Sequence, residues 1–69
     1  MNQNISELTK KYESKIYEEM EKRGLSEEEI PVVINKTGFR EALEKYPEEQ
    51  MHYSISDTVD DIIFVATTK

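Results

Sequence analysis

Residues 61–67 read Asp-Ile-Ile-Phe-Val-Ala-Thr, and the five central positions are all apolar. β-Branched and aromatic residues favour strands, and successive strand side chains point to opposite faces. A strand over this range would place Ile62 and Phe64 on one face and Val65 on the other. Both faces would then need a cover, which predicts a central strand buried by helices or by a second molecule.

The preceding segment predicts a second strand, because apolar and polar residues alternate strictly over 50–56. A third strand is predicted over 31–35, where a short β-branched run follows Pro31. For that range a helix continuing through Pro31 is the open alternative, since proline is tolerated in a first helical turn. Helices are predicted over 5–23, from apolar residues at helical spacing, and over 38–46.

These elements predict an α+β fold in one small domain of 69 residues. The long first helix would precede a split β-α-β-β unit, a three-stranded antiparallel sheet in the order 1-3-2. The pattern leaves open whether the two helices cover both faces of the sheet or share one face. If they share one face, the other is an exposed apolar surface and predicts a homodimer.

Composition excludes several classes of protein. The chain has no cysteine, which rules out disulfides, thiol nucleophiles and cysteine-ligated metals. The net charge is −6, and all of it falls in residues 24–69, because residues 1–23 hold five acidic and five basic side chains. Direct nucleic-acid binding needs clustered cations and is not expected. The sequence shows neither a membrane-spanning run nor a signal peptide, which predicts a cytoplasmic protein.

Few side chains suggest chemistry. His52 could act as a general base, and the turn carrying Asp57, Asp60 and Asp61 could bind a divalent cation. A small hydrolase or metal-dependent enzyme centred on His52 and Asp57–Asp61 is therefore the alternative function. We expect a solvated histidine and an ordinary turn instead, because serine, histidine and aspartate on one hairpin line up rather than converge. No catalytic, metal or cofactor site is predicted.

The favoured function is a non-enzymatic regulatory module that binds a protein partner or its own copy. A more specific version is a small acidic inhibitor, of the kind a phage or mobile element encodes, acting on a basic partner. An exposed aromatic on the first helix and one face of the predicted sheet supply the candidate contacts. These residues are Tyr17, Met51, Tyr53, Ile63 and Val65.

Overall fold

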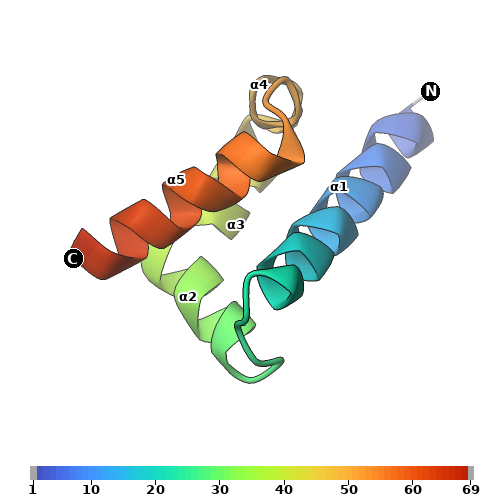
Figure 1. The fold of residues 1–69 in the computed structure, drawn as a ribbon. Helices are drawn as coiled ribbons and strands as arrows, with labels where there is room; N and C mark the ends of the chain where they lie inside the picture. Colours follow the sequence, from blue (N-terminus) through green and yellow to red (C-terminus); the bar gives the residue numbers. More distant parts are fainter. Residues whose placement is uncertain (1, 69) are drawn as a thin grey trace.

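The chain folds into a small bundle of helices (Figure 1). The computed structural model describes the backbone of residues 2–68 and the side chains of residues 5–68. Within that range it contains five α-helices and no strand. The helices are α1 (Asn2–Lys22), α2 (Glu29–Thr37), α3 (Phe39–Lys45), α4 (Pro47–Met51) and α5 (Ile55–Thr68).

The predicted α+β fold, with its three-stranded sheet in the order 1-3-2, is wrong. The range 31–35 lies in α2, and 61–67 lies in α5. The range 50–56 runs from the end of α4 through a short turn into the start of α5. The question of how two helices cover a sheet therefore does not arise, and a dimer cannot be inferred from a bare sheet face.

Helix α1 is amphipathic, and only part of its apolar stripe is covered. Tyr12, Ile16 and Met20 are buried in the core. Ile5 and Leu8 continue the same stripe but are exposed. The first turns of α1 extend past the other helices, which explains the exposure of these two apolar residues (Figure 1).

Helix α1 ends in a Schellman motif. Gly24 has a φ of 99°, in the left-handed region that glycine adopts without strain. The N–H of Leu25 donates to the carbonyl of Met20 at 3.2 Å, and that of Gly24 donates to the carbonyl of Glu21 at 3.0 Å. Leu25 then packs against the core, so the motif fixes the direction in which the chain leaves α1.

Helix α2 begins at a capping box that overrides the effect of Pro31. The N–H of Glu29 donates to Ser26 Oγ at 3.2 Å, and the N–H of Ser26 donates to Glu29 Oε1 at 2.9 Å. Pro31 falls in the first turn of α2, where a missing N–H is tolerated. The helical alternative for 31–35 is thus the one the structure contains.

The capping box predicts an acid-dependent contribution to stability. The pKa of Glu29 lies below its usual range, mainly because the Ser26 backbone N–H bonds its carboxylate and secondarily because the Ser26 side chain does. Stabilisation from this pair is present above the pKa of an unfolded glutamate and is lost as pH falls through the lowered folded pKa. Ser26→Ala is expected to return the pKa only part of the way, because the backbone donor remains. An NMR titration checks this, and a Glu29 midpoint equal to that of a model peptide would contradict it.

Helix α5 contains the whole apolar run of residues 62–66. Its first turn is capped by Ser54, whose Oγ accepts from the N–H of Asp57 at 3.1 Å. Ile62 is 2% exposed, whereas Phe64 is 65% exposed. In a strand these two side chains would share a face, but two residues along a helix turn about 200° and separate them.

The core lies between α5 and the helices that pack on it, chiefly α1 and α2. β-Branched residues cost a helix less than about 0.7 kcal/mol each, whereas burying a large aliphatic side chain contributes about 1.5–3 kcal/mol. Burial of Val59 and Ile62 therefore outweighs the weak strand preference of α5. The buried apolar side chains are Tyr12, Ile16, Met20, Ile30, Ile34, Phe39, Leu43, Val59 and Ile62.

Arg23 joins the end of α1 to the start of α5. Its guanidinium donates to Asp60 and also to Glu19 Oε2 at 3.0 Å. It donates further to Ser56 Oγ at 3.1 Å and to the Ser56 carbonyl at 3.3 Å. The carboxylate of Asp60, followed by that of Glu19, raises the pKa of Arg23. One carboxylate of α5, Asp60, is thus already neutralised within the chain.

Candidate protein-binding cavity

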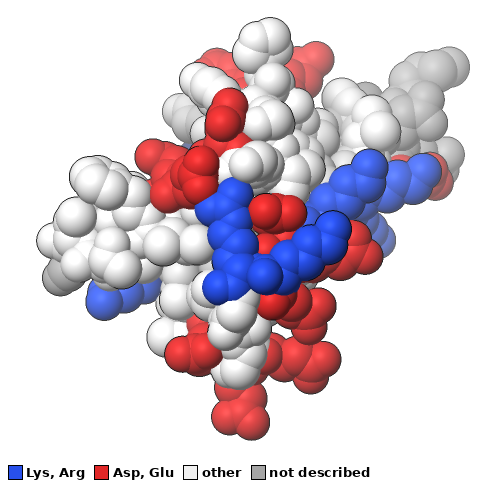
Figure 2. Space-filling model, in the orientation of Figure 1, with Lys and Arg blue, Asp and Glu red and all other residues white. Residues whose placement is uncertain are grey.

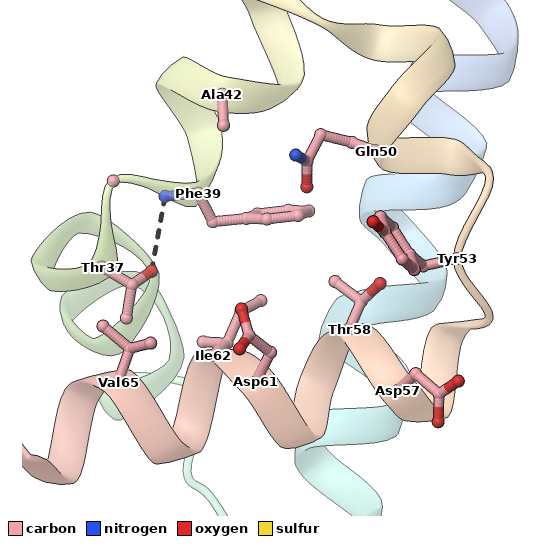
Figure 3. Close-up of a pocket in the computed structure, with 11 residues that line it drawn as sticks. Thr37, Phe39, Ala42, Gln50, Tyr53, Asp57, Thr58, Asp61, Ile62 and Val65 are labelled. Carbon is pink, nitrogen blue, oxygen red and sulfur yellow. Dashed lines mark hydrogen bonds between the residues drawn. The ribbon is translucent and has the colours of Figure 1, made fainter.

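A cavity of about 590 Å³ opens between α5 and the segments that face it (Figure 3). We call it the α5 cavity. One wall comes from the junction of α2 and α3, another from α4 and the turn after it, and the third from α5. The lining residues are Thr37, Gly38, Phe39, Ala42, Gln50, Tyr53, Asp57, Thr58, Asp61, Ile62 and Val65.

The junction of α2 and α3 shapes the apolar part of the cavity. Gly38 ends α2 with a φ of 75° and lets α3 begin at once with Phe39. The N–H of Phe39 donates to Thr37 Oγ1 at 3.4 Å, and that hydroxyl donates to the carbonyl of Ile34 at 2.9 Å. The Phe39 side chain then extends toward the side of Gln50 and Tyr53, with Ile62 of α5 below it in the view (Figure 3).

A buried tyrosine on α1 holds the opposite wall. The hydroxyl oxygen of Tyr12 lies 2.6 Å from Thr58 Oγ1, 2.9 Å from the carbonyl oxygen of Gln50 and 3.0 Å from that of Tyr53. Thr58, Gln50 and Tyr53 all line the cavity. One hydroxyl group on α1 therefore fixes the position of α4 and of the turn that carries Tyr53.

The charge of the cavity has one sign. Asp57 and Asp61 lie one turn apart on α5, are exposed, and are the only charged residues in its lining. Neither forms an ion pair within the described residues, in contrast to Asp60. Acidic side chains gather over the first part of α5, whereas its C-terminal end carries none (Figure 2). The site is thus apolar at one end and anionic at the other.

The structure separates the interaction residues that the sequence grouped on a sheet face. Tyr53 and Val65 line the α5 cavity. Met51 and Ile63 are partly buried and pack against the core without lining the cavity. Tyr17 on α1 is not the exposed aromatic that the sequence predicted, because it is partly buried and packs against the core. Its hydroxyl accepts from the Arg40 guanidinium at 2.9 Å. Only two of the five candidates therefore meet at one place.

The residues proposed for the alternative enzyme are also dispersed. His52 is exposed just after α4, with its ring centroid 6.1 Å from that of Tyr53, and it does not line the cavity. Asp60 forms an ion pair with Arg23, whereas Asp57 and Asp61 form none within the described residues. In the part of the chain that the structure describes, no three His, Cys, Asp or Glu side chains are grouped so as to hold a metal ion.

The sequence did not identify several residues that line the cavity, notably Phe39, Gln50 and Thr58. Thr58 could have been found from helical spacing, because Ile55, Val59 and Ile62 recur at steps of four and three and place their neighbours on an adjacent face. Nothing local in the sequence brings Gln50 and Phe39 to α5. Their approach depends on how α3 and α4 pack.

None of the helices within residues 2–68 is long and apolar enough to cross a membrane. No protein-family model, no curated protein and no solved structure matches this chain.

Proposed function

We propose that this chain is a non-enzymatic module that binds a basic segment of a partner protein in the α5 cavity. The observation that carries the proposal is the lining of the cavity, where apolar side chains adjoin two carboxylates and no cation. A segment with both apolar and cationic side chains complements such a lining. The net charge of −6 would also speed its approach, because opposite charges steer association.

Binding of this kind provides a mode of regulation. A basic surface that normally holds nucleic acid is a suitable ligand, because it offers the clustered cations that the cavity lacks. An acidic module occupying that surface would act as an inhibitor.

Binding is expected with an amphipathic peptide of leucine and lysine, and not with its leucine and glutamate counterpart. Asp61→Asn should weaken binding of the leucine–lysine peptide by about 1.4–5-fold at low salt, since an exposed ion pair contributes about 0.2–1 kcal/mol. Added salt should weaken binding to the unaltered protein as well. Fluorescence anisotropy with a labelled peptide measures both effects.

The matched control is Glu44→Gln, which removes one exposed carboxylate from α3 outside the cavity lining. It changes the net charge by the same amount as Asp61→Asn. Equal losses in the two variants would show that only net charge matters. Salt-insensitive affinity, or equal binding of the two peptides, would refute the proposal.

A further inference from the structure

A second surface of the chain has no partner among the described residues. It carries apolar and basic side chains, which complement the lining of the α5 cavity. Leu8, Lys11 and Lys15 follow one another on α1 at steps of three and four, which places them on one face of the helix. Leu8 is 53% exposed and both lysines are exposed. Neither lysine forms an ion pair with any other described residue. Basic side chains are seen along α1 (Figure 2).

The α5 cavity presents the complementary order of side chains. Val65, Asp61 and Asp57 are spaced at steps of four along α5, and all three line the cavity. Val65 lies at one end with Thr37, Asp57 lies at the other end, and Asp61 lies between them (Figure 3). The apolar end is extended by Ala42 and Phe39.

The two rows also match in length. A helix rises about 1.5 Å per residue, so Leu8 and Lys15 are about 10 Å apart along α1, and Val65 and Asp57 about 12 Å apart along α5. The apolar residue comes first in α1 and last in α5. The rows therefore coincide when the two helices run antiparallel.

We propose that the face of α1 bearing Leu8, Lys11 and Lys15, from a second copy of this chain, docks in the α5 cavity. Leu8 would enter the apolar end beside Val65, Lys11 would face Asp61, and Lys15 would face Asp57. Each such contact would cover the α1 surface of one copy and the α5 cavity of the other. It rests on the proposed function, because it uses the same cavity and the same kind of ligand.

Net charge does not prevent such a contact. Two copies at −6 repel at long range, but the Debye length at physiological salt is about 8 Å, so local pairs dominate at the contact. Residues 1–23 also carry no net charge, and within them α1 presents lysines to the carboxylates of the cavity. Docking of a copy would compete with an outside partner and would lower the affinity for it.

A charge-swap experiment tests the contact. Sedimentation velocity is expected to show the unaltered chain above monomer mass at millimolar concentration. Lys11→Glu/Lys15→Glu should be monomeric, and so should Asp57→Lys/Asp61→Lys. An equal mixture of the two variants should associate again, because acidic residues on α1 would then meet basic residues in the cavity. Lys22→Glu/Lys45→Glu makes the same change of charge at two other exposed lysines and should leave association intact.

Other outcomes overturn the proposal. A chain that remains monomeric throughout, or a mixture that does not associate, excludes this contact. If Asp57→Lys/Asp61→Lys fails to fold, Asp57→Asn/Asp61→Asn replaces it in the single-variant arm. Association of that variant as strong as that of the unaltered chain would also exclude the contact. The leucine–lysine peptide separates the two proposals. The Lys11→Glu/Lys15→Glu variant should still bind this peptide, because its cavity is unaltered. If the unaltered chain binds the peptide but does not self-associate, the docking of a second copy is refuted and the proposed function is retained.

Discussion

Ile62→Ala is expected to lower the free energy of unfolding by about 2–5 kcal/mol, which is typical of removing a buried aliphatic side chain. Ile62 is 2% exposed and packs in the core between α5 and its neighbours. A chain of 69 residues has a total stability of roughly 3–10 kcal/mol, so this variant would lose a large part of it. Urea denaturation followed by circular dichroism measures the loss.

Phe64→Ala is the matched control, since it removes a larger apolar side chain from the same helix. Phe64 is 65% exposed, and its removal is expected to change stability by no more than about 0.5 kcal/mol. In a strand both side chains would point to one buried face. Comparable losses in the two variants would therefore contradict the helical arrangement of α5.

Tyr12→Phe is expected to cost about 1–3 kcal/mol of stability, although it deletes a single oxygen atom. That oxygen is hydrogen-bonded to Thr58 Oγ1 and lies within bonding distance of the carbonyls of Gln50 and Tyr53. Phenylalanine would leave these groups without their buried partner. The variant should also bind the leucine–lysine peptide more weakly, because all three residues line the α5 cavity.

Tyr17→Phe provides the control for Tyr12. Its hydroxyl makes one exposed hydrogen bond, to Arg40, and removing it should change stability by no more than about 0.5 kcal/mol. Thermal melts and urea denaturation of both variants decide the matter. If Tyr12→Phe were as stable as Tyr17→Phe, the buried hydrogen-bond network would contribute nothing.

Helix α1 shows what the sequence could reveal about this fold. The spacing of Ile5, Leu8 and Tyr12 along one stripe identifies a helix without tertiary information. The stripe did not show that Ile5 and Leu8 would remain uncovered, because burial depends on where the other helices end.

Two local signals were given the wrong weight. The sequence favours a strand over 31–35, yet Ser26 and Glu29 cap a helix just before Pro31, and a first turn does not need the proline N–H. Alternation over 50–56 suggested a strand, but the segment is the end of α4 followed by the cap of α5 at Ser54. In each case a side-chain cap determines the backbone conformation, and residue propensities do not take capping into account.

The α5 cavity could not be predicted from spacing alone. Its walls come from Phe39, Gln50 and Thr58, which belong to three different segments. A buried hydrogen bond from Tyr12 fixes the arrangement of two of these segments, and nothing in the local sequence announces that bond. The sequence predicts that Asp57 and Asp61 lie in a polar turn, but their position beside an apolar wall follows only from the packing of the helices.

The bonds between the first and last helices bear on how the chain is made. Tyr12 reaches Thr58 across 46 positions, and Arg23 reaches Asp60 across 37. While a ribosome is still adding residues, α1 can form inside or near the exit tunnel, but its buried stripe lacks its contacts with α5 until that helix has emerged. Assembly of the complete bundle must therefore follow synthesis of the first half of α5, and until then a nascent chain would leave part of the α1 stripe uncovered.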